Sequence, residues 1–166
     1  AARRFLSRAE HEVDTLTQMV EELLELSRIE SGRVPIRLSA TAVSDLVEIP
    51  IERFRAQSER DDIELILALP ADLPNVLADE QRIHQVVNNL VHNAIKFTAN
   101  GSITIRAYSP ENTPKAIKRE IEDLPPSVVI CVQDTGTGIA PEELSRIFER
   151  FYKSDRARTR GKGGTG

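Results

Sequence analysis

The sequence has little of what would point to a disulfide-bonded, membrane-spanning or nucleic-acid-binding protein. Its single cysteine, Cys131, excludes an internal disulfide and lies in the apolar run VVICV, which is typical of a buried thiol. No apolar run reaches the roughly 18 residues that a membrane helix needs, and no signal-peptide pattern is present. The net charge of -4 gives no overall argument for nucleic-acid binding.

Both ends of the sequence suggest a fragment. The chain does not begin with methionine, and it stops inside the glycine-rich run GKGGTG. We therefore expect further sequence on both sides. With 166 residues, 40% of them hydrophobic and 29% charged, the chain is long enough for one medium domain with an appendage.

Residues 1–32 are expected to form one long amphipathic helix. They contain no proline and no glycine before Gly32, which would end the helix. Apolar side chains recur at spacings of three and four residues, at Ala9, Val13, Leu16, Val20 and Leu23. A single helix cannot bury its own apolar stripe. The pattern therefore predicts a helical bundle with upstream sequence, with a second chain, or with both.

The rest of the chain alternates between strand and helix patterns. Strands are expected at residues 34–40, 63–69, 102–108 and 127–134, the last in the centre of a sheet because its apolar run is continuous. Helices are expected at residues 41–58 with an interruption at Pro50, at 79–98 with Asp79 as its cap, and at 141–152. Residues 109–126 hold four prolines and predict a loop with room for one helical turn. Residues 153–166 predict a flexible loop.

The helix expected at 79–98 carries polar residues that helix propensity does not explain. At 100° per residue, one stripe contains Gln85, Asn89, Asn93 and Lys96. A neighbouring apolar stripe, expected to pack on a sheet, contains Ile83, Val86, Leu90, Ala94 and Phe97. A carboxamide oxygen can ligate Mg²⁺ without adding charge, and a lysine can meet a phosphate. A solvated polar face is the alternative, and this stripe alone does not decide between the two.

Three further patterns follow along the chain. The strand VICVQD ends in Asp134, whose carboxylate can accept from an exocyclic amine, and Gly136 and Gly138 permit close backbone approach or a positive φ. The aromatic residues of IFERFYK suit an anchor for the end of a helix. The basic residues of the terminal loop suit contact with a polyphosphate. Taken singly, a tight turn, a hydrophobic anchor and a solvated charge run explain them equally well.

Together and in this order, the segments NNLVHNAIKF, DTGTGI, FERFYK and GGTG resemble four boxes of the sensor histidine kinases of two-component systems. These are the N box, the first glycine box, the F box and the opening of the second glycine box. The segment HEVDTLTQMVEELLELSRIESG resembles the second helix of the dimerisation and phosphoacceptor domain. The resemblance implies a two-layer α/β sandwich that binds ATP at 33–166, cut off in the second glycine box, and a bundle-forming helix at 1–32.

The resemblance also implies roles for single residues. Asn93 would ligate Mg²⁺, Asn89 would line the phosphates, Lys96 would contact phosphate and Phe97 would flank the nucleotide. Asp134 would accept from the adenine amine, Gly136 and Gly138 would let the backbone approach, and Ile139 would lie against the base. The lid and the turn after it would add Tyr152, Lys153, Arg156, Lys162, Gly164, Thr165 and Gly166, with Arg158 as a further candidate.

The implied reaction is transfer of the γ-phosphoryl group of ATP, with Mg²⁺, to a histidine and then to an aspartate of a response-regulator receiver domain. The phosphoacceptor histidine is expected upstream, so no catalytic residue is assigned within the chain. His11-Glu12 is followed by Val13-Asp14, which departs from the family pattern. The resemblance further implies a cytoplasmic homodimer joined through the bundle, no nucleic-acid partner, and membrane attachment only through segments outside this chain.

Two alternatives remain. A gyrase-type ATPase or a protein-serine kinase relative uses the same pocket, but the ATPases carry glutamate at the position of Asn89. Glutamate can take a proton from water and an amide cannot, so Asn89 favours transfer over hydrolysis. The second alternative is a degenerate dimerising regulatory module, against which Asn93, Lys96 and Asp134 argue. The run GKGGTG also fits G-x-G-x-x-G, but no strand leads into it, so a dinucleotide fingerprint is not expected.

Overall fold

The computed structural model describes residues 35–149 without a gap, together with residues 13, 17, 20, 23–24, 27–29 and 31–32. The described residues between Val13 and Ile29 are helical, in agreement with the helix expected there. Gly32 follows with a φ of +66°, as expected of a residue that ends a helix. The chain divides into two compact units, and the unit Arg37–Gly138 contains the sheets.

The main sheet has three strands, β2 (Ile63–Ala68), β4 (Gly101–Tyr108) and β5 (Val129–Asp134). β4 lies in the middle, parallel to β2 and antiparallel to β5. The expectation that the last strand is central is therefore wrong for the described part of the chain, where β5 pairs with β4 alone. A second, smaller sheet pairs β1 (Ser39–Thr41) with β3 (Val76–Ala78) in antiparallel fashion.

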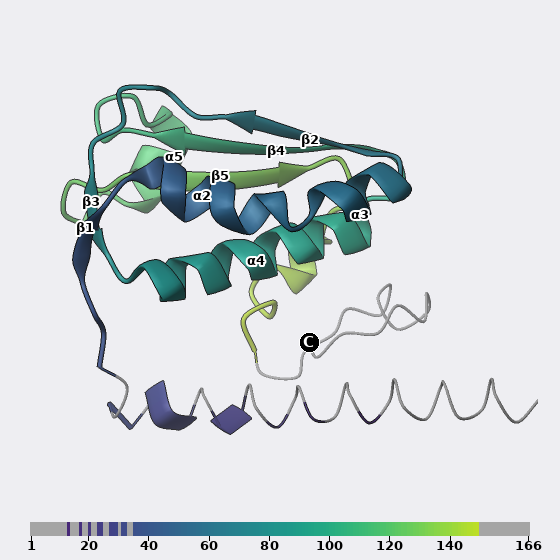
Figure 1. Ribbon diagram of the computed structural model, residues 1–166, viewed down its shortest axis with the longest axis horizontal. Coiled ribbons are helices and arrows are strands. Elements are labelled where there is room, and N and C mark those ends of the chain that lie inside the picture. Colours follow the sequence, from purple (N-terminus) through teal and green to yellow (C-terminus); the bar gives the residue numbers. More distant parts are fainter. Residues whose placement is uncertain are drawn as a thin grey trace, which may run out of the picture. The chain divides into compact units, whose positions relative to one another are not determined.

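Two helices, α2 (Val43–Glu52) and α4 (Glu80–Phe97), cover one face of the main sheet (Figure 1). Every second residue of β4 faces these helices, because side chains alternate along a strand. The buried core joins both layers and includes Val43, Val47, Ile51, Val87, Val91, Ile95, Ile63, Ile103, Ile105 and Ala107. The predicted two-layer α/β arrangement is therefore confirmed.

The helix expected over residues 41–58 is divided into α2 and the shorter α3 (Arg55–Arg60). Pro50 lies inside α2, where it is buried. Its ring removes one backbone donor and crowds the preceding turn, and α2 ends two residues later. The interruption that Pro50 predicts is thus confirmed, and it lies at residues 53–54, between α2 and α3.

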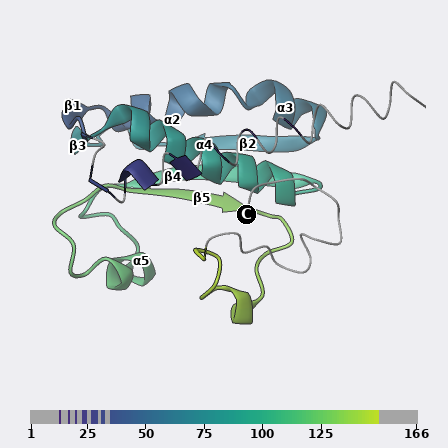
Figure 2. The same ribbon diagram turned by 90° about the horizontal axis from the view of Figure 1, so that it is seen from below.

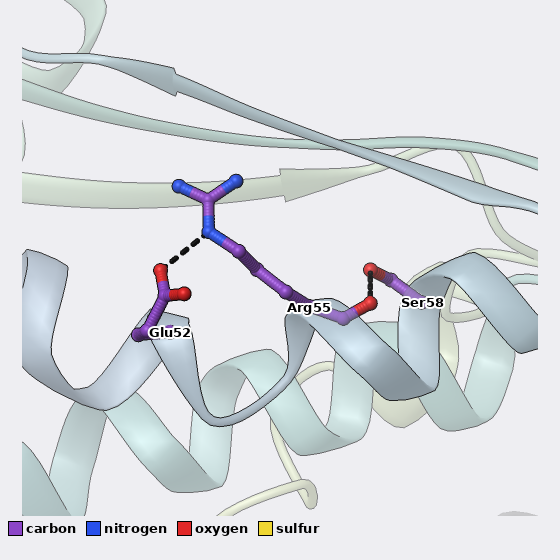
Figure 3. A network of polar contacts seen from close by, with 3 residues as sticks. All are labelled: Glu52, Arg55 and Ser58. Atoms are coloured by element: carbon purple, nitrogen blue, oxygen red, sulfur yellow. Dashed lines mark hydrogen bonds and ion pairs between the residues drawn. The ribbon is translucent and has the colours of Figure 1, made fainter.

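Polar contacts connect the end of α2 with the beginning of α3 (Figure 3). The Arg55 guanidinium donates through Nε to the Glu52 carboxylate, and the Ser58 hydroxyl donates to the Arg55 carbonyl at 2.9 Å. Both charged side chains are more than half exposed, so this ion pair contributes little stability. The apolar contacts near this junction come from Ile51, buried at the end of α2, and from the partly buried Phe54 before α3, whose own buried residue is Ser58.

Several boundaries differ from those expected. The first strand is limited to Ser39–Thr41, and β3 was not predicted. The proline-rich segment, expected to be a loop with room for one helical turn, does contain a short helix, α5 (Lys115–Glu120), beside the β5 edge of the sheet (Figure 2). The described part of the expected helix 141–152 is a 3-10 turn, Pro141–Glu143, followed by turns to residue 148. An isolated short helix is marginal in water, and Phe148 in this segment is 92% exposed. No described helix is both long and apolar enough to cross a membrane.

Candidate functional site

The site that the sequence predicts depends on α4, whose beginning is fixed by Asp79. One carboxylate oxygen of Asp79 accepts from the backbone N–H of Arg82 at 3.2 Å, which caps the helix. The other accepts from the backbone N–H of Arg37 at 2.9 Å, just before β1. These two hydrogen bonds hold the pKa of the Asp79 carboxyl below its ordinary value, and the bond from Arg37 has the largest effect. One side chain thus joins the entry of the sheet unit to α4.

The buried face of α4 differs from the apolar stripe expected from its sequence. Val87, Val91, Ala94 and Ile95 are buried, whereas Val86 is 52% and Leu90 46% exposed. The expected stripe is therefore wrong at Val86 and Leu90. α4 packs against α2 as well as the sheet, and this second contact turns the buried face by about one residue position.

The polar stripe of α4 lies on the side of the helix away from this core. Asn89 and Asn93 are exposed, one helical turn apart, and Lys96 follows on the same side, half-buried. The Lys96 ammonium lies 5.2 Å from the centroid of the Phe97 ring, within the range of a cation–π contact. The structure therefore keeps two carboxamides and one ammonium together on an accessible face.

Asp134 lies at the end of β5, on the side of the sheet that the helices cover. Ile130 and Val132 of the same strand pack against the core, and alternation places Asp134 on their side. Its Oδ1 accepts from the backbone N–H of Gly136 at 2.8 Å. Among the described residues, Oδ2 has no hydrogen-bond partner, so one oxygen can accept from a ligand.

Gly136 brings the residues after β5 against the end of α4. A Cβ placed on Gly136 would lie 2.5 Å from the Phe97 carbonyl oxygen and 2.7 Å from Oδ1 of Asp134. The next residue, Thr137, donates its N–H to the same Phe97 carbonyl at 3.3 Å. The structure therefore brings Asp134 beside the helix end that carries Lys96 and Phe97. The close approach at Gly136 is to the backbone of Phe97, and its expected approach to a nucleotide stays a prediction.

Gly138 ends the sheet unit with a φ of +64° and open space where a Cβ would be. The backbone conformation requires glycine at position 138, whereas the lack of room for a side chain requires glycine at position 136. Ile139 belongs to the other compact unit, so its placement against a base stays a prediction. The remaining predicted site residues, Tyr152, Lys153, Arg156, Arg158, Lys162, Gly164, Thr165 and Gly166, lie outside the described residues.

The site offers few ligands for a metal ion. In the described part of the chain, no group of three His, Cys, Asp or Glu side chains could hold one. The exposed carboxamide of Asn93 is a neutral oxygen donor of the kind that Mg²⁺ accepts. Mg²⁺ usually keeps several waters and is bound by one or two protein groups together with substrate phosphates. This donor set fits such an ion better than a cage of protein ligands.

A family model described as histidine kinase-, DNA gyrase B- and HSP90-like ATPase matches residues 78–166, which is more than half of the chain. The chain belongs to this family. The match begins at the end of β3 and includes α4, β4, β5 and the turn after Asp134. The family model therefore covers the part of the chain that carries the residues predicted to bind the nucleotide.

Curated relatives of this chain include proteins named as sensor or signal-transduction histidine kinases. Sensor-like histidine kinase SenX3 of Mycobacterium tuberculosis is 35% identical over 99% of the chain, and drug sensory protein A of Synechocystis is 36% identical over 91%. Signal transduction histidine-protein kinase BarA of Escherichia coli is 30% identical over 99%. The chain spans 37%, 22% and 17% of these relatives' lengths, respectively.

Solved structures of histidine kinases share the fold. Full-length ShkA, crystallised in complex with AMPPNP, has a TM-score of 0.73 and 28% identity, covering 93% of this chain and 31% of its own. The histidine kinase ThkA, crystallised with the response regulator protein TrrA, has a TM-score of 0.66 and 26% identity, covering 86% of this chain and 38% of its own. The resemblance to sensor histidine kinases drawn from the sequence is confirmed.

Proposed function

We propose that the chain is the ATP-binding part of a sensor histidine kinase, and that it delivers the γ-phosphoryl group of ATP to a histidine outside this chain. The observation that carries the proposal is the approach of Asp134 to the end of α4. The Gly136 backbone packs on the Phe97 carbonyl, and one oxygen of Asp134 is left to accept from a ligand. ATP offers an amine for that oxygen and phosphates for the polar face of α4.

Asp134 would recognise the adenine base through its exocyclic amine. A carboxylate that accepts from an amine forms a charge-assisted hydrogen bond, which is stronger than a bond between neutral groups. The hydrogen bond from Gly136 orients the carboxylate before any ligand arrives. Gly136 and Gly138 let the backbone come close to the base, and Ile139 would add an apolar contact.

The exposed face of α4 would hold the triphosphate and its Mg²⁺. Asn93 would ligate the ion, Asn89 would line the phosphates and Lys96 would neutralise phosphate charge. Mg²⁺ bound there would supply charge compensation for the phosphoryl group that is transferred. The basic residues beyond 150, with Gly164, Thr165 and Gly166, would close over the same phosphates as a lid.

The partners follow from the proposed relay. The helix at 1–32 would form a homodimeric bundle with a second copy, and residues 33–166 would form the ATP-binding domain. Apolar side chains on that helix, among them Val13, Val20 and Leu24, are exposed and available for such packing. The kinase would act in the cytoplasm and pass the phosphoryl group to the receiver domain of a response regulator. Asn89, in place of a glutamate that could activate water, supports transfer over hydrolysis.

The test is calorimetric titration of the chain with ATP, in the presence and absence of Mg²⁺. Asp134→Asn is expected to weaken ATP binding by about 10- to 100-fold, the usual effect of losing a hydrogen bond to a charged group. Asn93→Ala is expected to reduce the gain in affinity that Mg²⁺ provides. Asn75→Ala is the matched control, because Asn75 is an exposed amide directly before β3.

The outcome that would contradict the proposal is a folded chain that binds no ATP, or one in which Asp134→Asn and Asn75→Ala bind it equally well. Transfer is tested with this chain joined to its proposed phosphoacceptor helix. Radiolabel from the γ-phosphate of ATP should appear as an acid-labile phosphohistidine. Asn89→Glu should lower this signal, and rapid release of phosphate in place of the signal would favour the gyrase-type alternative.

A further inference from the structure

Thr135, which was not among the predicted site residues, makes contacts that hold Asp134 in place. Asp134 is the residue proposed to recognise the adenine amine. We propose that Thr135 is a positioning residue for adenine recognition, because its hydroxyl fixes the segment 134–137 against the beginning of β4 and thereby orients the Asp134 carboxylate. This inference rests on the proposed function, since it concerns how the same site recognises its base.

Thr135 lies just beyond the end of the strand ladder between β4 and β5. The pairing of β4 with β5 ends at Ile103 and Asp134. One residue further on, the N–H of Thr135 donates to the Ser102 carbonyl at 3.1 Å. In return, the N–H of Ser102 donates to the Thr135 hydroxyl oxygen at 3.0 Å. The hydroxyl therefore takes the place of a backbone acceptor and extends the ladder by one residue.

The beginning of β4 is shaped to receive this side chain. Gly101 has a φ of +131°, and a Cβ at this position would collide with the Thr135 hydroxyl oxygen. Gly101 therefore leaves room for the Thr135 side chain, because it has no side chain of its own. Thr135 takes part in two hydrogen bonds donated by backbone N–H groups and in one close approach. The residue is itself exposed, so its burial does not explain these contacts.

Thr135 is connected to the Asp134 carboxylate through the backbone of the same segment. Asp134 precedes Thr135, and its Oδ1 accepts from the N–H of Gly136, which follows Thr135. Gly136 in turn lies against the Phe97 carbonyl, which also accepts from the N–H of Thr137. The segment is therefore held at two places, on β4 through Thr135 and on α4 through Phe97.

The hold on β4 is the one that a side chain provides. Without the hydroxyl, the N–H of Ser102 loses its acceptor, while the bond from the N–H of Thr135 to the Ser102 carbonyl remains. We expect the segment to be less firmly fixed on β4, so that the N–H of Gly136 and the carboxylate that accepts from it vary more in direction. The consequence is specific to the adenine amine, because the phosphate contacts are proposed for α4, whereas the hydrogen bonds of Thr135 are made with Ser102 of β4.

The experiment compares ATP with purine riboside triphosphate, which lacks the exocyclic amine and otherwise matches ATP. The ratio of the two affinities in the full chain measures recognition of the amine. Thr135→Val keeps the shape and removes the hydroxyl, and it is expected to reduce this ratio by about three- to tenfold, the effect of one hydrogen bond. Binding of purine riboside triphosphate should stay within about twofold of the unmodified chain.

Two further variants guard against loss of folding, which circular dichroism and thermal melting would report. Thr135→Ser and Thr135→Ala differ by the hydroxyl alone, so the serine variant should retain the ratio and the alanine variant should lose it. Thr137→Val is the matched control in the same segment. The Thr137 hydroxyl has no hydrogen-bond partner among the described residues, so the ratio should be unchanged.

Three results would overturn the inference. The first is an unchanged ratio in both Thr135→Val and Thr135→Ala. The second is an equal loss of affinity for both nucleotides, which would make the hydroxyl a support of the fold without a role at the base. The third is an unmodified chain that binds both nucleotides equally, which would refute the assignment of adenine to Asp134 as well. The first two leave the proposed function standing, so the two failures are distinguishable.

Discussion

Replacing Gly136 by alanine tests whether contact between the end of β5 and the end of α4 builds the site. The new Cβ would lie 2.5 Å from the Phe97 carbonyl oxygen, so the segment must move by about 0.5 Å to reach 3.0 Å. The obstacle is backbone at a helix end, which cannot turn aside as a flexible side chain would. Overpacking of this kind typically costs about 1 to 3 kcal/mol of unfolding free energy.

Two measurements check this prediction. Thermal melting of Gly136→Ala should show a midpoint several degrees below that of the unmodified chain. Titration with ATP should show a larger loss than stability alone implies, because the movement displaces the Asp134 carboxylate. Gly138 provides the comparison, since a Cβ there meets nothing within 4 Å and only its φ of +64° opposes substitution.

The two glycines should therefore respond differently to asparagine. Gly138→Asn is expected to be better tolerated than Gly138→Ala, because asparagine adopts the left-handed conformation more readily. At Gly136 the larger asparagine should be worse than alanine. If Gly136→Ala melted and bound ATP like the unmodified chain, the argument that the Phe97 carbonyl limits the space at Gly136 would be refuted.

Two further predictions concern the scaffold. The pKa of Asp79 is lowered in the folded chain, so its stabilising effect is complete above its ordinary value of 3.8 and is lost as the pH falls through that value toward the lowered pKa. Asp79→Ala should therefore melt below the unmodified chain at neutral pH by a difference that shrinks below pH 3.8, and a difference that persists in stronger acid would contradict this. Ile105 is fully buried in β4, so Ile105→Ala should cost about 2 to 5 kcal/mol in denaturant unfolding. Leu77→Ala, at a side chain that is 70% exposed, should change stability by no more than about 0.5 kcal/mol, and equal costs at the two positions would refute the assignment of the core.

Local patterns predicted the elements whose causes lie within a few residues. Asp79 was expected to cap α4, and its carboxylate accepts from the N–H of Arg82. Pro50 was expected to interrupt a helix, and α2 ends soon after it. Strand alternation located β4, because β-branched residues at every second position need one buried face. The extent of β1, the position of β3 and the turns after Pro141 were missed, since such short segments depend on neighbours that periodicity does not reveal.

The candidate site also has features that local sequence predicted and features that depend on contacts between distant segments. The types of residue at Asn89, Asn93, Lys96 and Asp134 suggested nucleotide chemistry, and their order along the chain gave the family. The supporting contacts of Asp134 were not predicted, because Ser102 and Phe97 are more than 30 residues away along the chain. An indication was present in the run DTGTG after an apolar strand, and in the Asn100-Gly101 turn before β4, but neither pattern says that the two meet.

By itself, the sequence determined the alternation of helices and strands, the cap of α4 and the polar stripe that sets Asn89 and Asn93 on one face. These features depend on helical and strand periods and on side chains that bond within their own turn. Only the tertiary structure decided that Val86 and Leu90 are exposed, that β4 is the middle strand of the described sheet, and that Gly136 lies against the Phe97 carbonyl. Each of these results from packing between segments distant along the chain, where the positions of α2 and β5 determine which surface of α4 is buried and which is left for a ligand.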